Sequence, residues 1–160
     1  MSEESDTINI KGLDQLLKAL KARPPLCRIG ILGNSNARRG GKSGVTNATV
    51  GAVHEFGAPG RNIPQRSFLR VPLTDKLEKY LEQSRAFDKE VLAEVIAQGS
   101  IFPWMQKVAA SAKQVVGDAF ETSGFGKWPK WKDPNYRNEG GMLLVDTQSL
   151  RDSITTEVKA

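Results

Sequence analysis

The chain has 160 residues, of which 39% are hydrophobic, enough for the core of one domain and too few for a membrane protein. Its formal net charge of +5 permits contact with nucleic acid or another anion, but the cations are spread along the chain and favour no particular partner. No apolar run reaches the roughly 18 residues of a membrane-spanning helix, and the acidic start at residues 2–6 is unlike a signal peptide. We therefore expect one cytoplasmic domain over residues 1–160, with residues 1–6 as a disordered tail.

Reactive residues are few. Cys27 is the single cysteine, so an internal disulfide is excluded, and one cysteine with the single histidine, His54, falls short of a zinc site. His54 and Glu55 are adjacent, but neighbours on a helix point in different directions, which argues against an acid–base pair. Ser67, Ser153 and Cys27 have no partner motif for a nucleophile. We expect no enzymatic activity, no cofactor and no metal.

The first third of the chain predicts strand, helix, strand and loop. Residues 7–10 alternate like a short strand, and leucines at 13, 16, 17 and 20 have the three-four spacing of an amphipathic helix that the prolines at 24 and 25 end. Residues 27–32 read as a buried strand, with Cys27 as a small buried residue. Residues 33–47 are polar and rich in glycine, which predicts a long loop.

That loop contains Gly40-Gly-Lys-Ser, which partly matches a phosphate-binding P-loop. Asn36 stands at the first glycine position of the pattern, and residues 44–47 make a poor first helical turn. We therefore interpret the segment as a loop without nucleotide. Its basic residues are Arg38, Arg39 and Lys42.

Residues 48–73 are unusual because charged residues stand among glycines, prolines and aromatic residues. Val50, Val53 and Phe56 share one face of a short helix, and Gly57 occupies the position of a left-handed helix cap. Prolines at 59 and 64 then exclude regular structure, and Pro72 fits the first turn of the next helix. The pattern predicts an exposed loop that is held at both ends.

Two helical regions and a second loop follow. Apolar spacing from Leu73 to Ile96 predicts one long helix or two consecutive ones that stop at Gly99, and Ile101 to Phe120 forms a clean stripe with Ser100 as its cap. Residues 123–141 are a long loop by composition. Its aromatic and basic residues fit stacking on nucleic acid, anchoring of a protein interface, or packing onto the loop's own domain. These aromatic residues are Trp128, Trp131 and Tyr136.

The end of the chain predicts short strands at residues 142–145 and 154–158, with a helical turn that Asp146 or Thr147 caps between them. Together these elements predict an α+β fold. A small, mainly antiparallel sheet from the two ends and residues 26–32 packs against the two long helical regions, with extended interface loops.

Two segments resemble one protein family. Val-His-Glu-Phe-Gly at 53–57 with Ile-Pro-Gln-Arg-Ser-Phe-Leu-Arg at 63–70 looks like the signature of the virion-morphogenesis, neck and tail-completion proteins of tailed bacteriophages, such as Mu-like and lambda-like head–tail joining proteins. The segment from Leu144 to Thr155 is similar to the closing motif of that family. Gln148 stands where the family usually has glycine, and a residue other than glycine resists positive φ.

The resemblance implies a structural protein that joins head to tail or completes the tail, as a six-fold ring around the DNA channel or a twelve-fold one nearer the portal. A ring subunit shows a different face to each neighbour. Arg38, Arg39 and Lys42 are then candidates to face DNA, and we expect His54 and Glu55 to hydrogen-bond the backbone of residues 61–66 or a neighbouring subunit. The candidate interface residues are His54, Glu55, Phe56, Arg61, Ile63, Pro64, Arg66, Phe68, Trp128, Trp131, Tyr136 and Arg151.

Two other functions stay open at this point. One is a tail terminator or minor tail protein of the same particle, which the sequence does not distinguish from a neck protein. The other is a basic nucleic-acid-binding module, which the net charge and the tryptophan loop favour but which leaves both motifs unexplained. In each case we expect no contact with a membrane.

Overall fold

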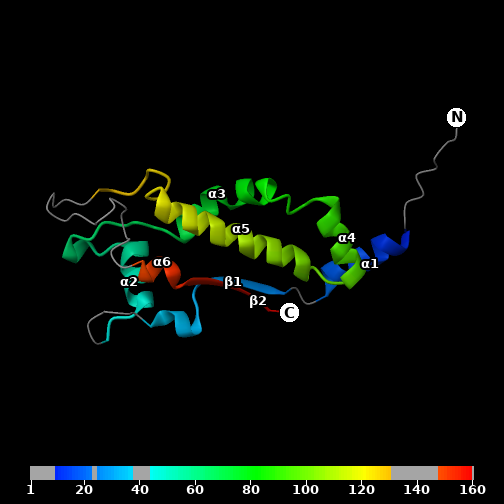
Figure 1. The fold of residues 1–160 in the computed structure, drawn as a ribbon, viewed down its shortest axis with the longest axis horizontal. Helices are drawn as coiled ribbons and strands as arrows, with labels where there is room; N and C mark the ends of the chain where they lie inside the picture. Colours follow the sequence, from blue (N-terminus) through cyan, green and yellow to red (C-terminus); the bar gives the residue numbers. More distant parts are fainter. Residues whose placement is uncertain (1–9, 23–24, 38–43, 131–147, 160) are drawn as a thin grey trace.

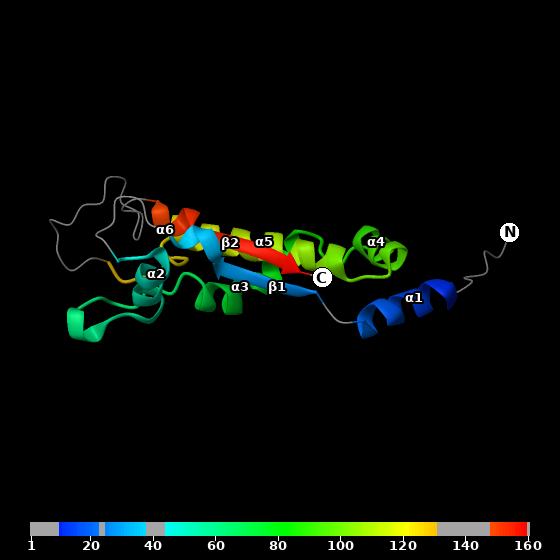
Figure 2. The same cartoon turned by 90° about the horizontal axis from the view of Figure 1, so that it is seen from below.

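The computed structural model describes residues 10–22, 25–37, 44–130 and 148–159, and within them the chain is α+β, as the sequence predicts. Figures 1 and 2 show the arrangement from two sides. The helices are α1 (Ile10–Lys21), α2 (Asn47–Phe56), α3 (Arg70–Gln83), α4 (Lys89–Gln98), α5 (Phe102–Glu121) and α6 (Ser149–Asp152), with 3₁₀ turns η1 (Gly33–Asn36) and η2 (Pro59–Arg61), and the strands are β1 (Leu26–Ile31) and β2 (Ile154–Lys159).

The sheet joins segments that lie far apart in the sequence. β1 pairs with β2 in antiparallel register, so that Leu26 lies opposite Lys159 and Ile31 opposite Ile154. Both strands are at their predicted positions, but Cys27 is half-buried rather than buried and Leu26 is exposed. The predicted strand at residues 7–10 is wrong at Ile10, which begins α1. Residues 7–9 and the predicted strand at 142–145 lie outside the described residues.

Helix α5 is the centre of the fold. Its apolar stripe is half-buried at Trp104, Met105 and Val108 and buried from Ala109 to Phe120, where Val115, Ala119 and Phe120 have no exposed surface. The sheet contacts one side of α5 and α3 contacts another, so that α5 lies between them (Figure 1). As predicted, a proline lies in its first turn. The cap position is occupied by Ile101 rather than by the predicted Ser100, although the Ser100 hydroxyl accepts a hydrogen bond from the Phe102 N–H at 3.2 Å.

The predicted helical region from Leu73 to Ile96 forms two helices. The chain leaves α3 after Gln83, and Arg85 takes a left-handed backbone conformation, with φ 55°, that an α-helix does not contain. An ion pair between Arg85 and Asp88 spans this break. The sequence predicts that the sheet packs against both helical regions. In the structure the sheet packs against α5, whereas α3 lies on α5 and α4 lies on α1 and α5.

Two apolar clusters result from this arrangement. The larger one surrounds Phe120 and includes Phe68, Trp128, Leu150 and Ile154, which come from four separate segments. The smaller one joins α1, α4 and the start of α5 through Ala19, Val95 and Ile101. In Figure 2, α1 lies at the opposite end of the molecule from α2 and α6. In the ranges that the structure describes, no helix combines the length and apolar content needed to cross a membrane.

Candidate assembly surface

Glu55 holds the start of α3 from a different helix. It lies on α2 with 6% of its surface exposed, and its Oε2 accepts hydrogen bonds from the backbone N–H groups of Phe68 and Leu69, both at 3.0 Å. Its Oε1 accepts from the Ser67 hydroxyl at 2.6 Å and from the Arg70 N–H at 3.1 Å. The first N–H groups of a helix have no partner within the helix, and an anion suits that end of the helix dipole. The carboxylate therefore caps α3.

The segment between α2 and α3 is a short hairpin. Ala58 and Ile63 form an antiparallel bridge around the turn at η2. Gly57 has φ 75°, and a Cβ there would lie 2.9 Å from the Gln65 nitrogen. The prediction of positive φ at Gly57 is confirmed, but its ψ of 168° is not that of a left-handed cap, so the backbone turns away from α2 directly into the hairpin. We call residues 56–65 the hairpin edge.

The base of the hairpin is fixed by the segment after α5. The Trp128 indole N–H donates to the Ser67 carbonyl at 3.0 Å, and the Arg66 Nε donates to the Pro129 carbonyl at 3.0 Å. A Cβ on Gly124 would lie 2.2 Å from the Trp128 ring, so that only glycine leaves room for the indole. This turn of the chain therefore locks residues 66–68 against the core.

The C-terminal motif meets the same region. The Ser149 hydroxyl and the Asn47 side chain are hydrogen-bonded at 3.2 Å, which links α6 to the first residue of α2. The Asn47 amide nitrogen also donates to the carbonyls of Ser35 and Ala37, so the predicted loop at 33–47 is ordered at its start. A Cβ on Gly51 would lie 3.4 Å from both Leu150 and Phe68. The two segments that carry the family resemblance are thus in contact.

Gln148 has φ 54° and ψ −10° just before α6, the left-handed conformation that a residue other than glycine resists. We predict that Gln148→Gly raises the free energy of unfolding by about 0.5–1 kcal/mol, because glycine adopts this conformation without the steric cost. Chemical denaturation measures the change. The matched control is Gln106→Gly within α5, which is expected to lower stability by about 1 kcal/mol. A loss of stability in Gln148→Gly contradicts the backbone assignment.

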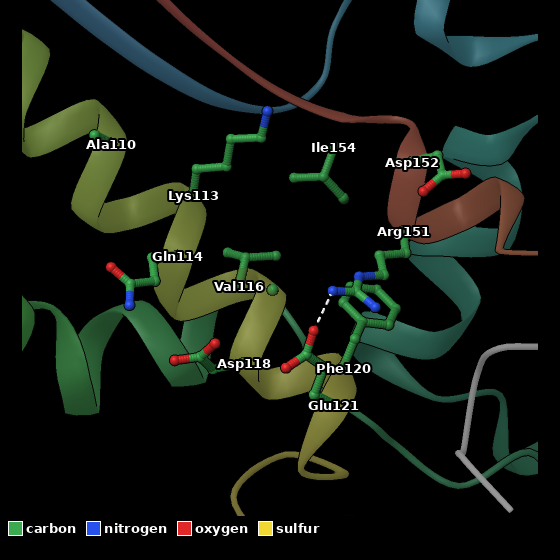
Figure 3. A pocket seen from close by; sticks show the side chains of 11 residues that line it. Ala110, Lys113, Gln114, Val116, Asp118, Phe120, Glu121, Arg151, Asp152 and Ile154 are labelled. Atoms are coloured by element: carbon green, nitrogen blue, oxygen red, sulfur yellow. Dashed lines mark hydrogen bonds and ion pairs between the residues drawn. The ribbon is translucent and has the colours of Figure 1, made fainter. Parts of the chain in front are cut away.

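A groove of about 610 Å³ runs between α5 and the segment formed by α6 and β2 (Figure 3). Arg151 and Glu121 form an ion pair across it, and Arg151 contacts α5 rather than pointing away from the subunit. Asp118, Asp152 and Lys113 also line the groove, so it carries three carboxylates and two cations. A groove with this mixture of charges is better suited to bind the surface of another protein than to bind a small anion.

Tyr80 donates a hydrogen bond to Asp118 beside this groove. Burial, the hydrogen bond and the Asp118 charge raise the pKa of Tyr80 to about 12 from its usual 10. The folded state therefore holds the phenol proton more tightly than the unfolded state does. The stability that results is complete below pH 10 and is lost as pH rises from 10 to 12.

We predict that the wild-type chain loses about 2 kcal/mol relative to Tyr80→Phe over that interval, because phenylalanine does not titrate. Denaturation of both proteins at several pH values between 8 and 12 measures this difference. An unchanged difference across the interval contradicts the hydrogen bond between Tyr80 and Asp118.

The structure separates the predicted interface residues into three groups. Glu55, Arg66, Phe68 and Trp128 are buried within the subunit, which corrects their placement on an exposed contact surface. Phe56 is 66% exposed and Arg61 is exposed, whereas His54, Ile63, Pro64 and Arg151 are half-buried. The remaining candidates lie outside the described residues: Trp131, Tyr136, Arg38, Arg39 and Lys42.

The prediction that Glu55 hydrogen-bonds the backbone of residues 61–66 is wrong for its carboxylate, which binds residues 67–70 instead. Contact with residues 65 and 66 is made by the backbone carbonyls of His54 and Glu55. The His54 carbonyl accepts from the Arg66 N–H at 2.8 Å, and the Glu55 carbonyl accepts from the Gln65 side chain at 3.0 Å. Sequence reasoning missed Asn47, which has no local motif to mark it. In the described ranges, no group of three or more His, Cys, Asp or Glu residues is placed to hold a metal ion.

Comparison with known proteins yields no match: no family model, no curated protein and no solved structure is similar to this chain.

Proposed function

We propose that the chain is a structural virion protein of a tailed bacteriophage that joins head to tail or completes the tail, with its copies arranged as a ring around the DNA channel. One observation carries the proposal. The two segments that resemble the family lie about ninety residues apart in the sequence, yet Phe68 and Leu150 share one apolar cluster and Ser149 bonds Asn47. If the chain has the fold of that family, its two motifs are expected to lie in contact.

The exposed part of the first motif supplies a face for a neighbour. Phe56 and Arg61 are both exposed on the hairpin edge, and aromatic and arginine side chains dominate the binding energy of protein interfaces. Glu55, Gly57 and Trp128 hold the hairpin edge in one conformation, which limits the entropy lost on binding. A ring subunit needs a second, different face. The charged groove beside Arg151 is our candidate for it.

The experiment is to assemble particles with Phe56→Asp and with a control, Thr74→Asp, at an exposed position of α3. We expect Phe56→Asp to fold normally but to leave heads and tails unjoined, because a charge replaces the aromatic contact. Thr74→Asp is expected to give joined particles. Electron microscopy counts the two kinds of particle. Joined particles at wild-type numbers with Phe56→Asp overturn the role of the hairpin edge.

The rival functions have distinct outcomes. A chain located at the end of the tail tube in a particle image would be a tail terminator rather than a neck protein. A chain that is absent from particles and binds DNA with a steep dependence on salt concentration would be a nucleic-acid-binding module. The aromatic and basic residues that favour the module, at 131–137, lie outside the described residues.

A further inference from the structure

Helix α1 has a wider apolar face than its own chain covers. Ala19 is buried and Leu16 is half-buried where α1 packs against α4. The adjoining stripe, at four-three spacing, is open: Leu13 is 49% exposed, Leu17 41% and Leu20 55%. This spacing is that of a helix–helix seam, in which leucines of one helix insert between those of another. One half of the apolar face therefore lacks a partner in the described part of the chain.

The exposed surface continues across the neighbouring helix. A cavity of about 160 Å³ lies between α1 and α4 and is lined by Leu20, Phe87, Leu92 and Trp104. Phe87 is 64% exposed and Leu92 44%. Leu20 belongs both to the open stripe of α1 and to the lining of this cavity, so the stripe adjoins the exposed edge of α4. Figure 2 shows α1 and α4 at the end of the molecule away from α2. Contiguous exposed apolar patches mark protein contacts.

We propose that this patch binds a second copy of the same chain, through α1 helices that pack antiparallel about a two-fold axis at Leu17. The charged residues beside the leucine stripe favour a second copy of the chain as the partner, and they favour an antiparallel pair of helices. Asp14 and Lys21 are both exposed and lie on the same flank of the leucines, because they are seven residues, or two turns, apart. In an antiparallel pair, Leu13 meets Leu20 of the second copy and Asp14 falls opposite its Lys21.

A parallel pair is disfavoured by the same residues. In a parallel pair the flank of one helix that carries Asp14 and Lys21 would face the opposite flank of the other helix, so Asp14 and Lys21 of the two copies would lie on opposite sides of the seam and would form no ion pair with each other. The antiparallel pair has two complementary ion pairs, and it brings both α4 edges to the other flank of the seam. A two-fold contact does not close a ring, because a ring needs two different faces. The α1 pair is therefore separate from the ring contact and does not rest on the proposed function.

The test uses charge reversal in the full chain, with sedimentation velocity at low salt as the measurement. Lys21→Asp places Asp14 opposite an aspartate, and Asp14→Lys places Lys21 opposite a lysine. Each single variant is expected to weaken pairing by about 5- to 10-fold, given the size of exposed ion pairs. The double variant Asp14→Lys with Lys21→Asp is expected to restore it. A mixture of the two single variants is also expected to pair, because each then meets its opposite charge.

Two controls separate pairing from folding. Lys18→Asp makes the same charge change in the last turn of α1, farther from the leucine stripe, and is expected to leave pairing unchanged. In a Cys27→Ser background, Leu17→Cys is expected to form a disulfide between copies under mild oxidation, since the two-fold axis passes at this residue, whereas Lys18→Cys is not. A wild-type chain that sediments as a monomer at all concentrations overturns the proposal. Equal pairing in all charge variants overturns it as well.

Discussion

Glu55→Gln is expected to lower the free energy of unfolding by about 3 kcal/mol, the cost of leaving buried donors without an acceptor. The carboxylate of Glu55 accepts three backbone N–H groups and the Ser67 hydroxyl. Glutamine has the same shape but one acceptor oxygen, and its amide nitrogen would face the N–H groups of α3. The start of α3 and the base of the hairpin edge are therefore expected to loosen together.

Chemical denaturation measures the loss, with Glu78→Gln as the control. Glu78 is exposed on α3, and its replacement by glutamine removes the same charge without affecting a buried partner. The free energy of unfolding is therefore expected to change by less than about 0.5 kcal/mol. Hydrogen exchange adds a local test, because the amides of Phe68, Leu69 and Arg70 lose their acceptor in Glu55→Gln. If Glu55→Gln and Glu78→Gln prove equally mild, the carboxylate does not hold α3.

Trp128→Ala is expected to cost about 4 kcal/mol, within the range of large-to-small substitutions in a core. The ring is 8% exposed, packs edge-on against Phe120 at 5.9 Å between ring centres, and donates to the Ser67 carbonyl. Alanine leaves a cavity and an unsatisfied carbonyl. Because Trp128 and Glu55 hold neighbouring atoms of Ser67, the two losses are not expected to add.

Phenylalanine separates the ring from its hydrogen bond. Trp128→Phe keeps most of the apolar volume and loses the bond to Ser67, for which we expect a cost of about 1–2 kcal/mol. The control is Trp104→Phe in the smaller cluster, because the buried Trp104 indole nitrogen has no hydrogen-bond partner in the described part of the chain. That substitution removes no bond, so a smaller cost is expected. A larger cost for Trp104→Phe than for Trp128→Phe contradicts this account of the indole.

The sequence predicts the elements that depend on local pattern. The stripe of α5 and the apolar alternation of β1 each set one face toward the core, and the positions of α1, β1 and α5 are confirmed. The leucine spacing of α1 predicts the helix but not its buried face, because Leu13, Leu17 and Leu20 are exposed. The break between α3 and α4 is less visible, because residues 84–88 contain neither glycine nor proline. Local sequence propensity therefore does not reveal the break, which is seen only in the left-handed backbone conformation of Arg85.

The candidate site is predictable in position but not in orientation. The mixture of charges, glycines and aromatic residues at 48–73 does locate a segment where much of the hydrogen bonding converges. It leaves undecided whether Glu55 and Arg66 face outward or inward, because their partners belong to segments distant in the sequence. Trp128 illustrates the same limit, since an aromatic ring in a loop fits an interface, a nucleic acid or its own core equally well. In the structure Trp128 is buried in the core of its own domain.

The proposed ring contact combines buried and exposed residues of one motif. The buried residues of the motif fix the hairpin edge, and Phe56 and Arg61 stay exposed on it. Substitutions at Glu55 or Trp128 are then expected to impair assembly through folding, whereas substitutions at Phe56 impair it with the fold intact. Thermal unfolding alongside the particle counts distinguishes these two routes.

Cryo-electron microscopy of the assembled particle tests the central claim most directly. The proposal predicts density for this chain as a ring at the junction between head and tail, with the hairpin edge of each copy in contact with a neighbour. Particles that join fully without any density for the chain, or a chain placed with Phe56 and Arg61 in open solvent, would contradict it.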